Sequence, residues 1–138
     1  MTKPQIGEGD FADLDSFVDS TREERLADFL DLLRIPSIGT LTDNDLDTRA
    51  TAQFIADRLN AMGFDHVEVS PTGGQPIVYA DWLHAPGAPT VIVYAHYDVQ
   101  PVDPLDLWHR PPFDPVVENG RVYARGASDD KSHVYVHL

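Results

Sequence analysis

The sequence predicts an α/β fold in which helices flank a mixed sheet. Apolar residues recur at helical spacing through roughly the first sixty residues, and after Gly63 short apolar runs alternate with turns of glycine and proline. With 138 residues, the chain is long enough to bury one core. We divide it into residues 1–19, a tail with a possible short helix, and residues 20–138, which carry the rest of the fold.

Two amphipathic helices are expected before Gly63. In the first, apolar residues at positions 26, 29, 30 and 33 share one face, and Pro36 prevents the helix from continuing past Ile35. A capping box would begin this helix in one of two registers, Ser20 with Glu23 or Thr21 with Glu24. The second is expected over about 48–62, with its apolar stripe (positions 52, 55, 59 and 62) facing the core and Gly63 as the left-handed residue just past its end.

Strand patterns follow the helices. Residues 66–69 and 77–82 are expected to be strands, and residues 90–95, the most apolar run, to be a central strand covered on both faces. Residues 99–115 contain five prolines and predict a stiffened loop. Asn119-Gly120 predicts a hairpin over 116–124 with a type I′ turn that Glu118 and Arg121 could pair across. A helix is expected to start near Ser128 or Asp129.

Composition excludes several classes of function. A net charge of −13 and a pI near 4.5 argue against a nucleic-acid partner and against binding to an anionic membrane surface. The chain has no cysteine, so a bound metal would be held by His, Asp and Glu, which suits zinc, manganese or magnesium. The sequence has no apolar run of membrane length and no apolar segment typical of a signal peptide, so we expect a cytoplasmic protein.

The residues that could carry chemistry lie at a strand end and at a helix start. His96 and Asp98 are two apart, so their side chains should point the same way at the end of the 90–95 strand. Imidazole is a good zinc ligand, and a carboxylate often orients the ring through its other nitrogen. Asp129 could bridge two cations at the mouth of the next helix. Each pattern alone is more common as a polar strand end or as a helix cap.

Taken together, residues 96–101 (HYDVQP) and 126–131 (GASDDK) resemble the aminoacylase/carnosinase family of dinuclear zinc metallopeptidases, especially its dipeptidase branch. Residues 34–37 and 112–113 also match, so the resemblance covers almost the whole chain. It implies that His96 is a metal ligand, that Asp98 is the catalytic carboxylate orienting His96, and that Asp129 bridges the two metals. It further implies a cis bond from Asp129 to Asp130, two zinc ions with manganese as the alternative, a small peptide substrate and a homodimer.

The chain departs from the family in several ways. The family's general-base glutamate and its remaining metal ligands follow the Asp-Asp-Lys motif, whereas this sequence has seven residues after Lys131. Residues 20–138 are therefore expected to be an incomplete metallopeptidase catalytic domain, inactive alone. Ser132 replaces a common glycine, and His133 and His137 are expected to be surface or core residues without a ligand role.

Two other functions are left open. One is an N-acyl amino acid deacylase of the same family, although that branch more often has a small hydroxyl residue where this chain has Tyr97. The other is a non-catalytic remnant.

Overall fold

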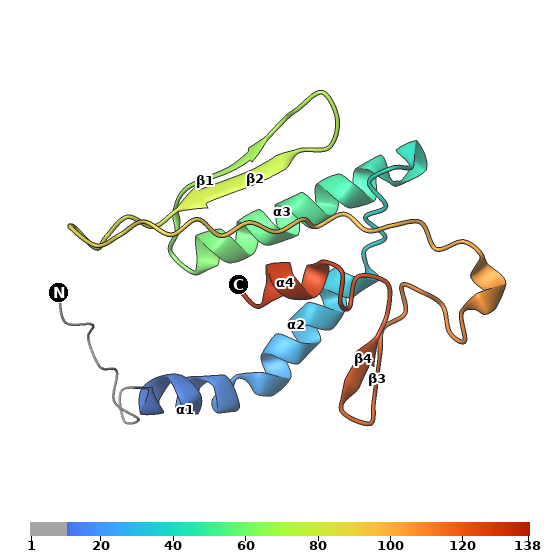
Figure 1. The fold of residues 1–138 in the computed structure, drawn as a ribbon, viewed down its shortest axis with the longest axis horizontal. Coiled ribbons are helices and arrows are strands. Elements are labelled where there is room, and N and C mark those ends of the chain that lie inside the picture. The colour runs from blue at the N-terminus through green and yellow to red at the C-terminus, as the bar shows by residue number, and fades with distance from the viewer. Residues whose placement is uncertain (1–10) are drawn as a thin grey trace.

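The computed structural model of the protein describes residues 11–138 (Figure 1). Its helices are α1 (Ala12–Ser20), α2 (Arg22–Arg34), α3 (Asp45–Ala61) and α4 (Lys131–Tyr135). Its strands are β1 (Asp65–Ser70), β2 (Ile77–Asp81), β3 (Val116–Glu118) and β4 (Arg121–Tyr123). Short 3₁₀ turns lie at Thr42–Asn44 and Leu105–Leu107. Residues 1–10 of the expected tail lie outside the described residues.

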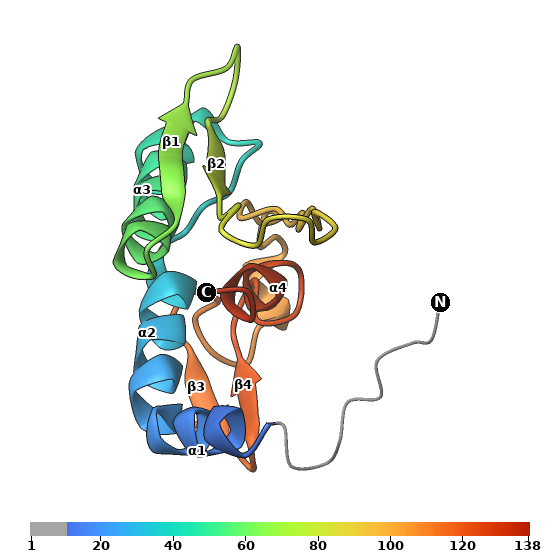
Figure 2. The ribbon, with the colours of Figure 1, turned by 90° about the vertical axis from the view of Figure 1, so that its left-hand side faces the viewer.

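The strands of this part of the chain form two separate antiparallel hairpins. The β1–β2 hairpin packs on α3, and α4 packs against α2 (Figure 2). In the β3–β4 hairpin, Asn119 and Gly120 both have positive φ (53° and 73°), which confirms the predicted primed turn. Glu118 and Arg121 are register partners, but Glu118 makes its ion pair with Arg110 at 3.2 Å, so the expected pairing across the turn is wrong. Helices combined with small sheets confirm the α/β class.

The expected capping box at the start of α2 is also wrong. Only Thr21 separates α1 from α2, so the hydroxyls of Ser20 and Thr21 lie beside the last carbonyls of α1. Both donate to the carbonyl oxygen of Phe17, at 3.1 and 2.7 Å. Neither hydroxyl caps an amide of α2. The carboxyl end of α2 lies where the sequence predicts, since the helix stops two residues before Pro36.

For α3, the expected glycine at its carboxyl end is confirmed, whereas the expected burial of Met62 is wrong. Gly63 has φ +82°, and the Phe64 amide donates to the Leu59 carbonyl at 3.1 Å, as expected for a glycine-terminated helix. Ala52 and Ile55 are buried in the core as predicted. Met62, however, is 46% exposed, because it lies past the last helical residue, where the chain turns away toward β1.

Residues 90–95 are not a paired central strand, and this expectation is wrong for the described chain. The segment is extended but has no ladder partner, since β1 pairs with β2 and β3 with β4 (Figure 1). Its side chains are correspondingly open: Ile92 is 88% exposed and Tyr94 is 87% exposed. An apolar run is buried on both faces only where other strands and helices cover it. Pairing begins further along, where Val99 forms a parallel bridge with Ile38.

The Asp28 side chain on α2 contacts both α3 and α4 and so joins three helices. It accepts from the Nε of Arg58 on α3 at 2.8 Å and from the hydroxyl of Tyr135 on α4 at 3.1 Å. The Tyr135 ring also packs on Phe29, with centroids 5.2 Å apart. Burial and the negative charge of Asp28 raise the pKa of Tyr135 to about 12.

This pKa predicts a pH dependence of stability. Because the folded-state pKa lies above the ordinary value of 10, the stability that Tyr135 contributes is complete below pH 10 and is lost as pH rises toward about 12. Tyr135→Phe keeps the ring but removes the titrating hydroxyl, so the variant should lose less stability than the parent across this window. Urea unfolding at several pH values measures the difference, and parallel curves for the two proteins would contradict the prediction.

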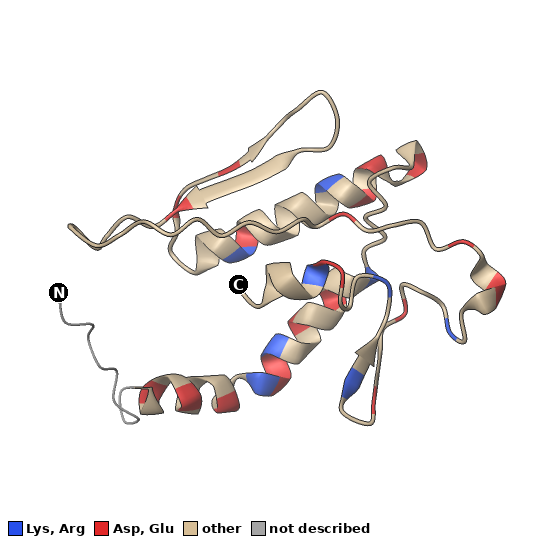
Figure 3. Ribbon diagram, viewed as in Figure 1, with Lys and Arg blue, Asp and Glu red and all other residues tan. Residues whose placement is uncertain are grey.

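Charged residues are distributed over the surface of the fold. Acidic positions occur along α1, α2 and α3 (Figure 3). Within residues 11–138, no helix combines the length and the apolar character needed to cross a bilayer.

Candidate metal centre

The loop after α2 holds the end of the extended segment in place. The Ser37 hydroxyl donates to the Tyr97 carbonyl at 2.7 Å, and the Val99 amide donates to the Ser37 carbonyl at 2.8 Å. Ser37, Ile38 and Val99 are all buried. These bonds fix the backbone on either side of Asp98, so the orientation of residues 96–98 is set by contacts with a loop about sixty residues earlier in the chain.

Lys131 anchors the start of α4. Its side chain is completely buried, and its ammonium donates to the carbonyls of Leu32 (2.9 Å) and Ile35 (2.5 Å) at the carboxyl end of α2. Burial lowers the pKa of Lys131 to about 8. α4 begins at Lys131, two to three residues later than the sequence suggests, and this leaves Asp129 and Asp130 in the loop before the helix.

His96 Nδ1 lies between two acceptors from Asp98. The backbone carbonyl and carboxylate Oδ1 of Asp98 are each 3.1 Å from this nitrogen. Since neither oxygen can donate, Nδ1 must carry the proton, and in the neutral ring Nε2 keeps its lone pair. Burial opposes the charged ring, but the Asp98 carbonyl and the charges of Asp130 and Asp98 together raise the pKa of His96 above 6.5.

The free nitrogen of His96 points at the two carboxylates before α4. Nε2 lies 3.3 Å from Asp129 Oδ1 and 3.9 Å from Asp130 Oδ2. One ligand atom from each residue lies within 4.8 Å of the others. A nitrogen lone pair and two carboxylates repel one another unless a proton or a cation lies among them. One nitrogen and two oxygen donors fit zinc or manganese.

Asp130 is the member of this cluster that sequence reasoning missed. Its carboxylate is mostly buried and accepts from the His96 amide at 2.9 Å through Oδ2, while Oδ1 contacts the ring of His133. Burial raises the pKa of Asp130, but these two hydrogen bonds outweigh it and lower the pKa below 3.8. The Asp129–Asp130 peptide bond is cis. The sequence shows two adjacent acidic residues at this point, but only the fold shows which groups each carboxylate faces.

His133 on α4 and His137, two residues past the end of α4, are both exposed. His133 nevertheless contacts Asp130, three residues before it in the sequence. His137 is not among the residues of the cluster described above.

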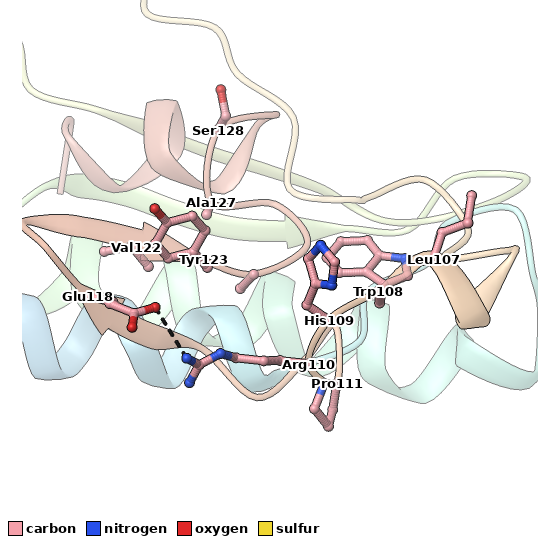
Figure 4. Close-up of a pocket in the computed structure, with 11 residues that line it drawn as sticks. Leu107, Trp108, His109, Arg110, Pro111, Glu118, Val122, Tyr123, Ala127 and Ser128 are labelled. Carbon is pink, nitrogen blue, oxygen red and sulfur yellow. Dashed lines mark hydrogen bonds and ion pairs between the residues drawn. The ribbon is translucent and has the colours of Figure 1, made fainter.

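A pocket of about 600 Å³ lies between the proline-rich loop and the β3–β4 hairpin (Figure 4). Trp108 and His109 stand on one side of it and Val122 and Tyr123 on the other, with the Arg110–Glu118 ion pair along its edge. The Trp108 indole donates to the Val102 carbonyl at 2.8 Å, which ties down the proline-rich loop. The lining includes Ser128, next to Asp129 in the chain, but none of the three cluster residues, so the pocket borders the cluster without containing it.

Comparison with known proteins supports the resemblance. Residues 92–138, which include His96, Asp98 and Asp129, match the pattern described as Peptidase family M20/M25/M40. The match covers the carboxyl-terminal part of the chain. The metallopeptidase resemblance read from residues 96–101 and 126–131 is therefore confirmed.

The proteins that this chain is similar to include a desuccinylase and dipeptidases. Succinyl-diaminopimelate desuccinylase of Nitrosospira multiformis is 40% identical over 82 residues, which cover 59% of this chain and 21% of the relative. Cys-Gly metallodipeptidase DUG1 of Candida albicans is 32% identical over 134 residues, covering 83% and 27%. The structure of human carnosine dipeptidase 1 aligns with a TM-score of 0.76 at 26% identity, covering 87% and 28%. The chain thus spans roughly a quarter of the length of these proteins.

Proposed function

We propose that this chain supplies part of a two-metal centre that hydrolyses the peptide bond of dipeptides. The observation that carries the proposal is the convergence of His96 and Asp129, 3.3 Å apart across 33 positions of sequence, with the other ring nitrogen of His96 committed to Asp98. The similarity to a Cys-Gly dipeptidase and to carnosine dipeptidase 1 supports dipeptides as the substrate class.

Each residue of the proposed centre has a distinct task. His96 presents Nε2 to a first metal ion, and Asp98 holds its ring in the tautomer that keeps this nitrogen unprotonated. Asp129, with a side chain 77% exposed, has an open side on which its carboxylate could bridge to a second ion. When bound, zinc or manganese polarises the scissile carbonyl and lowers the pKa of a bound water. Asp130 holds the His96 amide and thereby the position of the ring.

A second candidate function is hydrolysis of an N-acyl amino acid. The 40% identity to a desuccinylase favours it, because the name of that enzyme describes removal of a succinyl group. Tyr97, next to His96, favours the dipeptidase. Assaying a whole protein that contains this chain on unblocked dipeptides and on N-acyl amino acids separates the two functions.

The 138-residue chain alone is expected to hydrolyse no dipeptide. The family resemblance assigns the water-activating glutamate to a position after the Asp-Asp-Lys motif, and residues 132–138 contain no acidic residue. The measurement is release of free amino acids from a dipeptide with added zinc or manganese. Turnover that disappears in His96→Ala would show that these residues suffice and would overturn the expectation.

The proposal extends to the setting of the whole protein. A homodimer acting on small peptides in the cytoplasm is proposed on the family resemblance. The molecular mass of the whole protein in solution tests the dimer.

A further inference from the structure

Gly39 lies directly against the side chain that orients His96. A Cβ atom built on Gly39 would lie 2.8 Å from Asp98 Oδ2, 2.9 Å from Asp98 Cβ and 3.1 Å from Asp98 Cγ. Non-bonded carbon atoms prefer separations of about 3.5–4.0 Å, so these approaches are repulsive. The backbone of Gly39 is outside the left-handed region, and therefore the position requires glycine for space and not for an unusual φ.

The surrounding hydrogen bonds limit how far Asp98 can move to relieve this clash. A carboxylate oxygen could swing aside, but Asp98 Cβ moves only with its own backbone. That backbone is tied to the loop of Gly39 by the Ser37–Tyr97 and Ser37–Val99 hydrogen bonds on its two sides. The parallel bridge of Ile38 with Val99 holds the same two segments together. An added methyl group must therefore displace Asp98 or separate the loop from the end of the extended segment.

We infer that Gly39 is a positioning residue, whose missing side chain lets the Asp98 carboxylate reach His96 Nδ1 and so fixes the ring for metal binding. The chain of contacts is short: Gly39 abuts Asp98, Asp98 accepts from Nδ1, and Nε2 faces Asp129. The metal-binding part of this inference rests on the proposed function, whereas the effect on the ring does not. Gly39 itself touches neither metal nor substrate.

The test compares Gly39→Ala with Gly73→Ala. Gly73 makes a suitable control because its backbone is likewise outside the left-handed region and an added Cβ meets nothing within 4 Å. NMR of the His96 ring nitrogens, at a pH where the ring is neutral, should show the Nδ1–H tautomer in the parent and in Gly73→Ala. In Gly39→Ala, that single tautomer should give way to a mixture. Zinc affinity should fall about 10–100-fold in Gly39→Ala, as for loss of an outer-shell partner, and should not change in Gly73→Ala.

A double-substitution cycle covers the case in which Gly39→Ala does not fold. Asp98→Gly removes the three atoms that lie nearest to the new methyl group, so Gly39→Ala/Asp98→Gly should fold as well as Asp98→Gly alone. If the double variant is unfolded while Asp98→Gly is folded, Gly39 serves something other than Asp98 and the inference is wrong.

The remaining outcomes separate the inference from the proposed function. An unchanged tautomer and an unchanged zinc affinity in Gly39→Ala would also overturn the inference, while leaving the metal centre in place. A changed tautomer in Gly39→Ala, together with no zinc binding by a whole protein that contains the unaltered chain, would support the positioning role of Gly39 and would reject the metal centre.

Discussion

Replacing His96 with alanine is expected to weaken zinc binding to this chain by at least 10–100-fold. Loss of an outer-shell partner of a metal ligand typically costs that much, and His96 supplies the only nitrogen donor of the cluster found in the described residues. The remaining donors, Asp129 and Asp130, are carboxylates, which by themselves suit magnesium or calcium better than zinc. Isothermal titration with zinc measures the change. Asp129→Asn should also weaken binding, because it removes the charge of the more exposed carboxylate.

The matched control for His96→Ala is His84→Ala. His84 also lies beside an aspartate, with Nε2 2.5 Å from Asp65 Oδ2, but the pair has no third ligand in the described part of the chain. Zinc affinity should therefore be unchanged in this variant. Equal losses in the two variants would indicate non-specific binding to surface histidines and would contradict a metal centre at His96.

Replacing Lys131 with alanine is expected to destabilise the fold by about 3 kcal/mol. Hydrogen bonds from a charged donor contribute about 1.5–3 kcal/mol, and truncation of a long buried side chain also leaves a cavity. The carbonyls of Leu32 and Ile35 would lose the ammonium that they share. Burial of that ammonium is itself costly, which keeps the expected loss below the sum of these contributions. Urea unfolding measures the free energy.

Lys131→Met separates the charge from the packing. Methionine fills most of the same space without the ammonium, so it avoids the cavity and the desolvation cost but leaves both carbonyls without their donor. Its stability should lie between that of the parent and that of Lys131→Ala. A Lys131→Ala variant as stable as the parent would show that α4 is not anchored to α2 through this side chain.

The local features of the fold were largely predictable from the sequence. Pro36 and Gly63 end their helices for reasons of backbone geometry, and Asn119-Gly120 turns its hairpin because both residues tolerate positive φ. The same local reasoning failed for residues 90–95. An apolar run shows that a segment can be buried, but the elements that would cover it lie elsewhere in the chain.

The sequence by itself determined the family resemblance and the residue types of the candidate centre, because the spacing of His96 and Asp98 and the Asp129–Lys131 motif are local patterns. Only the tertiary structure decided which atoms meet. It turned Asp130 inward to the His96 amide, buried Lys131 under the end of α2 and brought Gly39 against Asp98. These contacts join residues 34 to 99 positions apart, and such contacts depend on how the whole chain packs and not on any pattern of neighbouring residues.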